Sequence, residues 1–327
     1  MPANLPPQYF EAEKRFRAAR DVDDKIAALQ EMLGIMPHHK GTDKLQADLR
    51  SRIAKLTQEA ERKRATARRT GFYIRREGAG QVILVGLPNS GKSQLLASLT
   101  DASPEVALYP YTTKAAMPGM MRFEDIQIQL VDTPPLGQKG VRPMISSLLR
   151  AADLLAIVVD LGADPLTEAE EAITELRECR IVPPTMPLDE QFSGGIYRPP
   201  VIIIGNKSDL GGALRNLRAL RERYESFFSV LGVSATEGEG LDELPDHLFR
   251  ALNIMRVYTK ARGQKADMSE PVILPVASTV GEAAAEIHKD FKRSLKHAVV
   301  WGSARYQAQT VGRKHVLEDG DVVEFRV

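Results

Sequence analysis

Two short motifs in this sequence place glycine, lysine and polar side chains at fixed spacings. The first is GLPNSGKS (86–93), which fits the pattern G-x-x-x-x-G-K-[ST] at every fixed position. It follows the apolar run QVILV and leads into QLLASL, so we expect a strand to deliver the loop to a helix N-terminus, where free N–H groups and the helix dipole favour phosphate. Lys92 is expected to reach the β- and γ-phosphates of a nucleotide, and Ser93 to ligate Mg²⁺. The other residues expected at this site are Gly86, Pro88, Asn89, Ser90, Gly91 and Gln94.

The second motif is NKSD (206–209), which directly follows the apolar run VIIIG. The carboxylate of Asp209 can accept hydrogen bonds from N1–H and from the exocyclic amino group of guanine, and adenine has neither donor. Adenine would leave that carboxylate unpaired, so the motif discriminates between the bases. Asn206 is expected to bond the opposite edge of the base, with the stem of Lys207 packed over the ring. Together the two motifs predict that the bound nucleotide is GTP or GDP.

The elements that must position these motifs are predicted by the hydrophobic pattern. The runs QVILVG, IQIQLVD, LLAIVVD and VIIIGNK alternate with helical stretches, and their nearly uniform apolar character is typical of parallel strands covered by helices on both faces. Ligands of such sheets gather at the carboxyl ends of the strands, which is where both motifs fall. The proline-rich segment 182–200 is expected to be a loop or a small excursion. We therefore predict an α/β fold for the central part of the chain.

The flanking regions have other patterns. Residues 9–69 carry apolar side chains at helical spacing, interrupted by Pro and Gly in MPHHKGT (36–42), which predicts a helical hairpin that ends in a basic run. From about Glu270 onward, PVILPV, AVVWG and DVVEFRV are strand-like and enclose one helix, for which Ser278 or Thr279 is the expected N-cap. This pattern describes a small α+β domain.

The composition excludes several classes of protein. The chain has 327 residues and a net charge of +1, so overall charge indicates neither a nucleic-acid nor a membrane partner. Cys179 is the only cysteine, which excludes an internal disulfide framework and a multi-cysteine metal site. No apolar run approaches the roughly 18 residues that suggest a membrane span. We expect a soluble cytoplasmic protein with no membrane partner, and we favour a monomer.

The motifs resemble those of the Obg-related translation-factor GTPases, and specifically of the DRG group (developmentally regulated GTP-binding proteins). The segment EVALYPYTTKAAMPGMMRFEDIQIQLVDTP resembles the switch I region and the following strands of that group, and RVYTKARGQKADMSEPVILP, HAVVWGSARY and LEDGDVVEFRV resemble its C-terminal TGS domain. The resemblance implies a helical hairpin at 1–78, a Ras-like P-loop NTPase domain at 79–255 and a β-grasp-like TGS domain at 256–327.

The resemblance also implies roles for further residues. Thr112 or Thr113, with Thr113 favoured, matches the threonine that senses Mg²⁺, and Asp132 matches an aspartate that acts on Mg²⁺ through water. Ser234 and Ala235 resemble an S-A element whose backbone contacts the guanine oxygen. TGS domains are implied to contact the ribosome, rRNA or tRNA, although an ordinary solvated surface is the alternative. The basic side chains compatible with phosphate contacts are Lys289, Lys292, Arg293, Lys296, Arg305, Arg313 and Lys314.

One position departs from the pattern of the Obg-related family, and a second departs from the Ras-like pattern but fits Obg-like proteins, which generally have an apolar residue there. The D-x-x-G element reads DTPP (132–135), and Pro135 has no N–H to offer a γ-phosphate. Leu136 stands where Ras-like enzymes carry the glutamine that orients water. We therefore predict slow Mg²⁺-dependent GTP hydrolysis, catalysed through Lys92, Ser93 and Thr113. The alternatives are a non-hydrolysing guanine-nucleotide scaffold or RNA adaptor, and an ATPase, against which the NKSD motif argues.

Overall fold

The computed structural model describes residues 9, 12, 15–16, 22–36, 46–47, 49–57, 74–100, 116–137, 141–188, 195–288, 293–304, 306 and 308–326. The chain divides into two compact units, residues 1–73 and 74–327. Among the described residues, no helix combines the length and the apolar character needed to cross a membrane.

The first unit contains helix α2 (Val22–Ile35), and residues 49–57 are also helical. Buried Leu29 and Met32 of α2 share a core with Leu49, and Ile53 and Leu56 pack against it. The helical spacing seen in the sequence therefore corresponds to one shared apolar core. The basic run expected at the end of the hairpin lies outside the described residues.

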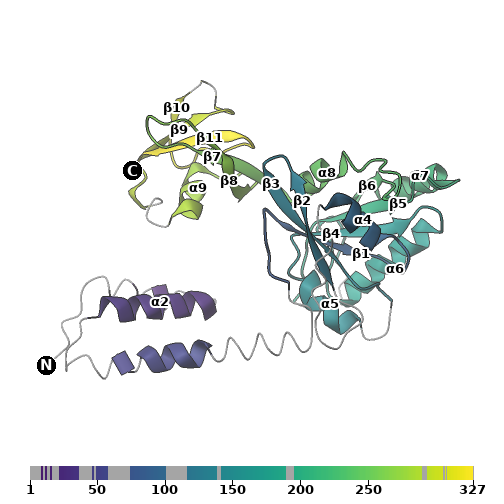
Figure 1. The fold of residues 1–327 in the computed structure, drawn as a ribbon, viewed down its shortest axis with the longest axis horizontal. Helices are drawn as coiled ribbons and strands as arrows, with labels where there is room; N and C mark the ends of the chain where they lie inside the picture. The colour runs from purple at the N-terminus through teal and green to yellow at the C-terminus, as the bar shows by residue number, and fades with distance from the viewer. Residues whose placement is uncertain are drawn as a thin grey trace. The chain divides into compact units, whose positions relative to one another are not determined.

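The second unit begins with a six-stranded sheet in the order β2-β3-β1-β4-β5-β6 (Figure 1). The strands are β1 (Gln81–Val85), β2 (Met117–Phe123), β3 (Ile126–Asp132), β4 (Leu154–Asp160), β5 (Val201–Asn206) and β6 (Ser229–Gly232). Neighbouring strands are parallel except for the β2–β3 hairpin. Every residue of β1 and β5 is buried, which explains the uniform apolar runs. The predicted P-loop α/β fold is confirmed.

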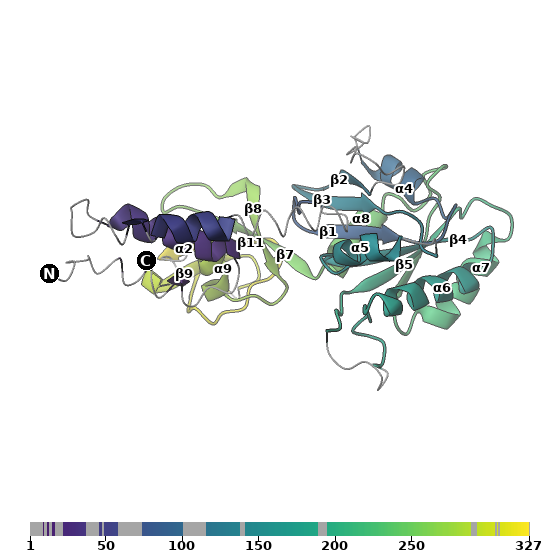
Figure 2. The same ribbon diagram turned by 90° about the horizontal axis from the view of Figure 1, so that it is seen from below.

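Helices lie on both sides of this sheet (Figure 2). They are α4 (Lys92–Leu99), α5 (Arg142–Leu149), α6 (Pro165–Glu178), α7 (Ala213–Tyr224) and α8 (Leu244–Ala251). Leu95 of α4 and Phe249 of α8 belong to one core cluster with Val82 and Leu84 of β1. Helix α6 packs against β4 and α7. These helices pack on the faces of the sheet, and the loops that follow β1, β3 and β5 lie at its carboxyl edge.

The C-terminal part is a mixed five-stranded sheet in the order β10-β9-β11-β7-β8, with helix α9 (Val280–Ile287) in its core. Its strands are β7 (Ile254–Thr259), β8 (Asp267–Pro275), β9 (His297–Trp301), β10 (Gln309–Val311) and β11 (Asp321–Arg326). Central β7 and β11 are parallel, whereas the outer pairs are antiparallel. This is the predicted β-grasp-like arrangement. Strands β7 and β10 were not predicted from the sequence.

Thr279, rather than Ser278, is the N-cap of α9. Its Oγ1 accepts from the backbone N–H of Glu282 (3.4 Å), and the carboxylate of Glu282 accepts from the backbone N–H of Thr279 (2.7 Å). This reciprocal pairing is a capping box, which satisfies two otherwise unpaired N–H groups.

Candidate nucleotide-binding site

The loop between β1 and α4 surrounds the amino group of Lys92. Its Nζ donates to the carbonyl oxygens of Gly86 (3.1 Å) and Leu87 (2.9 Å) and to Oγ of Ser90 (3.2 Å). The residue is 5% exposed, and burial lowers the pKa of Lys92, although nearby carboxylates oppose this shift. A cation held by a loop at a helix N-terminus is suited to phosphate oxygens.

Gly91 allows this loop to turn into α4. Its φ of 88° lies in the left-handed region, and a Cβ at this position would lie 2.1 Å from Nδ2 of Asn206. Among the other predicted loop residues, Ser90 is buried, and the exposed ones are Pro88, Asn89, Ser93 and Gln94. The structure therefore gathers the whole first motif in one turn.

Ser93 and Asp132 meet beside the loop because β1 and β3 are parallel neighbours. The Oγ of Ser93 donates to Oδ2 of Asp132 (2.5 Å), and Thr133 donates to the carbonyl oxygen of Leu84 (2.7 Å). The Oδ1 of Asp132 is buried and has no hydrogen-bond partner among the described residues. Burial raises the pKa of Asp132, while the hydrogen bond from Ser93 lowers it. An unpaired carboxylate oxygen beside a hydroxyl is a donor set that suits Mg²⁺.

Asn206, at the end of β5, joins the two motifs. Its Nδ2 donates to the carbonyl oxygen of Ser90 (3.0 Å). Its Oδ1 accepts from the backbone N–H groups of Lys207 (2.8 Å) and Ala235 (3.1 Å). This buried side chain is therefore connected to the phosphate loop and to the segment that follows β6.

Asp209 lies beside the other predicted base contact. Its Oδ1 accepts from Oγ of Ser234 (2.5 Å), and Ser234 in turn accepts from the backbone N–H of Glu237 (3.0 Å). Asp209 is exposed, whereas Ser234 is buried. The structure thus brings NKSD and the segment 234–235 together at the carboxyl edge of the sheet.

Two carboxylates that the sequence analysis missed also lie at this edge. Asp160, the last residue of β4, forms an ion pair with Nζ of Lys207 and accepts from the backbone N–H of Gly162 (2.8 Å). Glu168 accepts from the backbone N–H of Asp160 (2.8 Å), and burial raises the pKa of Glu168. The only signal in the sequence was an acidic residue at the end of an apolar run.

The DTPP segment contacts the phosphate loop through the residue after its second proline. The backbone N–H of Leu136 donates to the carbonyl oxygen of Gly86 (3.0 Å). Pro135 itself has no N–H. Thr112 and Thr113, together with Lys289, Lys292 and Arg305, lie outside the described residues.

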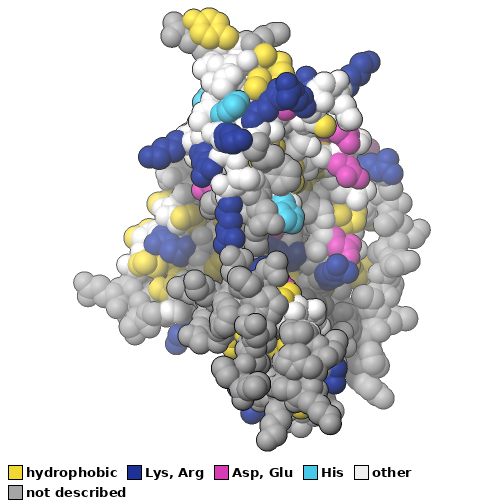
Figure 3. Space-filling model, turned by 90° about the vertical axis from the view of Figure 1, so that its left-hand side faces the viewer, with side chains coloured by type: hydrophobic (Ala, Val, Ile, Leu, Met, Phe, Trp, Pro, Cys, Tyr) yellow, Lys and Arg dark blue, Asp and Glu magenta, His cyan; other side chains and the backbone are white. Residues whose placement is uncertain are grey.

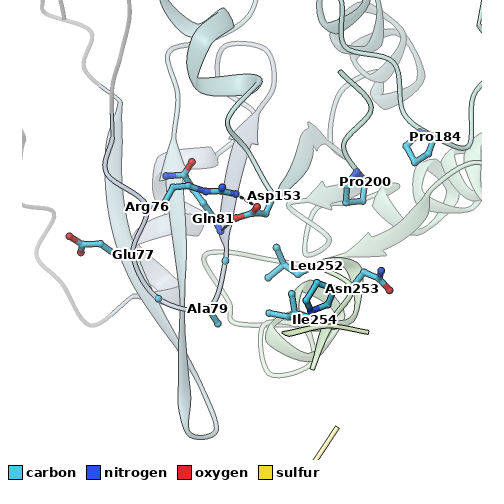
Figure 4. A pocket seen from close by; sticks show the side chains of 13 residues that line it. Arg76, Glu77, Ala79, Gln81, Asp153, Pro184, Pro200, Leu252, Asn253 and Ile254 are labelled. Atoms are coloured by element: carbon cyan, nitrogen blue, oxygen red, sulfur yellow. Dashed lines mark hydrogen bonds and ion pairs between the residues drawn. The ribbon is translucent and has the colours of Figure 1, made fainter. Parts of the chain in front are cut away.

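A cavity of about 760 Å³ lies at the opposite edge of the sheet (Figure 4). Its lining includes Gln81, Asp153 and Pro200, which lie at the amino ends of β1, β4 and β5. Arg76 forms an ion pair with Asp153 in its wall. None of the nucleotide motif residues lines this cavity, so it is separate from the candidate site.

Known proteins match both parts of the second unit. Residues 81–187 match the family described as 50S ribosome-binding GTPase, and residues 255–327 match the TGS domain. The chain is 28% identical over 361 residues to an uncharacterised GTP-binding protein of Methanocaldococcus jannaschii, covering 92% of each chain. It is also 28% identical over 360 residues to ribosome-interacting GTPase 1 of Saccharomyces cerevisiae, covering 92% of this chain and 97% of that one.

A solved structure has the same fold. The YchF GTPase of Schizosaccharomyces pombe matches with a TM-score of 0.50 and 15% identity, over 78% of this chain and 100% of that one. The family matches and the fold define a P-loop GTPase domain followed by a TGS domain. The protein is thus a GTP-binding protein of the GTPase class, and its ligand is a guanine nucleotide.

Proposed function

We propose that this protein binds GTP and GDP with Mg²⁺ and hydrolyses GTP slowly. The observation that carries the proposal is the hydrogen bond from Asn206 to Ser90, which joins the base-reading loop to the phosphate loop. A single ligand that contacts both loops would place its phosphates in the first loop and its base in the second.

Each residue has a proposed role in binding. Lys92 exchanges its loop acceptors for β- and γ-phosphate oxygens. Asp209 accepts from the two donors of guanine, and the stem of Lys207 covers the ring while Asp160 holds its amino group. The backbone N–H of Ala235, which donates to Oδ1 of Asn206 in the structure, is the proposed donor to the guanine oxygen. Attack by water on the γ-phosphorus proceeds in line, with positioning as the main contribution of the protein.

We propose that Mg²⁺ is bound by Ser93, Asp132 and Thr113. The last of these lies outside the described residues. When bound, Mg²⁺ neutralises charge on the β- and γ-phosphate oxygens. The hydroxyl of Ser93 would be a direct ligand, and the buried carboxylate of Asp132 would act on the ion through water.

Lys92→Ala tests the hydrolysis proposal, with Lys265→Ala at an exposed position in the TGS domain as the matched control. We expect Lys92→Ala to abolish Mg²⁺-dependent phosphate release from GTP and to weaken GDP binding, because the variant lacks the positive charge proposed to contact the phosphates. The control should match the wild type in both. Equal phosphate release by the two variants would contradict the proposed role of Lys92.

A non-hydrolysing scaffold is the second candidate, and Pro135 favours it. Proline cannot donate to a γ-phosphate, and the N–H of the next residue, Leu136, is donated to Gly86. A scaffold would bind GTP and GDP equally and release no phosphate, so the same assay separates the two functions.

We further propose that the protein acts on the ribosome or another RNA through its TGS domain. Two matches support this: one family is described as ribosome-binding, and the yeast relative is named as ribosome-interacting. In the upper part of Figure 3, dark blue Lys and Arg side chains outnumber magenta Asp and Glu. The exposed basic residues of the domain include Arg293, Lys296, Arg313 and Lys314, and the guanidinium of Arg313 donates to backbone oxygens at 293 and 295.

Cosedimentation with ribosomes tests this proposal. The double variant Lys296→Gln/Lys314→Gln should weaken association and reduce its dependence on salt, because phosphate contacts release counterions. Arg215→Gln/Arg218→Gln on exposed positions of α7 removes the same charge and should leave binding unchanged. Equal effects of the two pairs would indicate nonspecific attraction only.

The finer assignments rest on the same matches. We propose that the protein belongs to the DRG type, supported by 27% identity over 365 residues to developmentally-regulated G-protein 3 of Arabidopsis thaliana. The division into 1–78, 79–255 and 256–327 is proposed with it. The cytoplasmic location and the monomeric state stay predictions.

A further inference from the structure

Arg256 lies on the first strand of the TGS sheet but faces the GTPase domain. Along β7, Met255 and Val257 belong to the TGS core, so Arg256 and Tyr258 alternate onto the opposite face of the sheet. Arg256 is nevertheless only 8% exposed. Its burial therefore comes from groups outside the TGS core.

Three carboxylates from two turns surround its guanidinium. Nε and Nη2 donate to the two oxygens of Asp319 (3.1 and 2.7 Å), which lies in the turn before β11. Nη1 donates to Asp125 (2.9 Å) and to Glu124, both in the turn of the β2–β3 hairpin. Tyr258 donates its hydroxyl to the other oxygen of Asp125 (2.6 Å). Arg256 is thus the cation that holds two acidic turns together, and these hydrogen bonds raise its pKa further.

The guanidinium of Arg256 also lies over two aromatic rings of the GTPase domain. The guanidinium carbon lies 5.1 Å from the ring centre of Phe249 on α8 and 5.7 Å from that of Phe123 on β2. The two rings are 5.0 Å apart. Such a contact, largely shielded from water, is a favourable cation–π arrangement.

The β2–β3 hairpin connects this turn to the nucleotide site. Strand β3 begins at Ile126, beside the turn, and ends at Asp132, whose carboxylate accepts from Ser93. Its seven residues span roughly 20 Å as an extended strand. Strand β2 begins at Met117, shortly after the segment that contains Thr113. A displacement of the turn would therefore be transmitted along β2 and β3 to the Mg²⁺-binding residues proposed above.

We propose that Arg256 is a positioning residue of the nucleotide site, which links the placement of Asp132 to the contact between the hairpin and the TGS domain. This inference rests on the proposed role of Asp132. Because binding linkage is reciprocal, a nucleotide state that shifts β3 also changes how firmly Arg256 holds the hairpin turn. The contact between the TGS domain and the hairpin turn then depends on which nucleotide is bound.

The test uses the full chain with Arg256→Met, and with Arg250→Met as the control. Arg250 forms an exposed ion pair with Asp246 within α8 and makes no contact with the hairpin turn among the contacts described. Two readouts are measured: hydrogen exchange of residues 123–126 and 318–320 with GDP, with a non-hydrolysable GTP analogue and without nucleotide, and the dissociation constant of GDP with Mg²⁺ and with EDTA. The second readout reports the Mg²⁺ site specifically.

In the wild type and in Arg250→Met, exchange in both turns should depend on the nucleotide. In Arg256→Met this dependence should be lost, and the gain in GDP affinity from Mg²⁺ should fall by about fivefold or more, the lower end of ordinary coupling. If Arg256→Met does not fold, Asp125→Ala, which leaves the pairing of Arg256 with Asp319 in place, must give the same result.

Either variant with wild-type responses in both readouts would overturn the inference. A wild type that binds GDP but shows identical exchange in every nucleotide state would also overturn it, while leaving the nucleotide site intact. A wild type that binds no GDP would instead refute the nucleotide site itself, and with it the role of Arg256.

Discussion

Gly91→Ala is expected to separate the phosphate loop from the base-reading loop. A Cβ at this position would lie 2.1 Å from Nδ2 of Asn206, far inside van der Waals contact, so the amide must move. It would then lose its hydrogen bond to the carbonyl oxygen of Ser90. The substitution therefore alters a contact between two segments that are 116 residues apart in the chain.

The magnitude follows from two contributions. An alanine at a φ of 88° is destabilised by about 1–2 kcal/mol relative to its ordinary conformations. Loss of the Asn206–Ser90 hydrogen bond adds about 1 kcal/mol. We expect the free energy of unfolding to fall by about 2–3 kcal/mol. If most of the roughly 1 kcal/mol from Asn206 is expressed in binding, the affinity for GDP should fall about fivefold, since 1.4 kcal/mol is tenfold.

Gly212→Ala is the matched control. Gly212 precedes α7 as Gly91 precedes α4, it has a φ of 90°, and a Cβ there would meet nothing within 4 Å. The control therefore carries the same backbone strain without the steric clash. Chemical denaturation measures the free energy of unfolding of both variants, and calorimetry measures their affinity for GDP in the presence of Mg²⁺. If the two variants lost stability and GDP affinity equally, the proposed link through Asn206 would be refuted.

Three further predictions concern the switch residues and the contact with the TGS domain. Burial raises the pKa of Asp132, so the folded state disfavours the charged carboxylate and is destabilised as pH rises through that pKa. Asp132→Asn should therefore raise the melting temperature at pH 7.5, yet abolish the effect of Mg²⁺ on GDP affinity. A lower melting temperature for the variant would contradict this. Pro135→Gly restores an N–H and should increase the preference for a GTP analogue over GDP, whereas an unchanged ratio measured by calorimetry would mean that another group makes the contact. Burial opposes the shift, but hydrogen bonds from Tyr258 and Arg256 keep the pKa of Asp125 lowered, and hydrogen bonds from Arg256 keep that of Asp319 lowered, so their stabilisation is present above the ordinary value near 3.9 and is lost as pH falls through the lowered values. The difference in melting temperature between wild type and Arg256→Met should shrink below about pH 4, and a constant difference would argue against these charges.

The sequence predicted where the two motifs lie in the fold, because the signals for their positions are local. The segment 81–93 contains its own strand, loop and helix start, and the carboxyl-edge rule for parallel sheets was enough to bring 206–209 close to it. The N-cap of α9 could also have been chosen, since Thr279 has a glutamate three residues later, whereas the residue three after Ser278 is Gly281.

The contacts that were missed depend on distant parts of the chain. Asp160 lies 47 residues before Lys207, and an acidic residue at a strand end has no spacing that distinguishes an ion pair from a solvated side chain. Arg256 pairs with carboxylates more than 130 residues away. Its partners are determined by how the TGS sheet packs on the hairpin, and no local pattern encodes that packing.

The central claim is that a guanine nucleotide binds between the two motifs, with Asp209 reading the base. The most direct measurement is the affinity of wild type and Asp209→Asn for GDP, ADP and xanthosine diphosphate with Mg²⁺. The account predicts that the wild type prefers GDP over ADP by roughly 10⁴-fold, because ADP lacks the two donors that guanine offers to the Asp209 carboxylate. Asp209→Asn should lose affinity for GDP and gain affinity for the xanthine nucleotide, whose carbonyl oxygen replaces the guanine amino group. Equal binding of GDP and ADP by the wild type, or the same base preference in both proteins, would contradict the account.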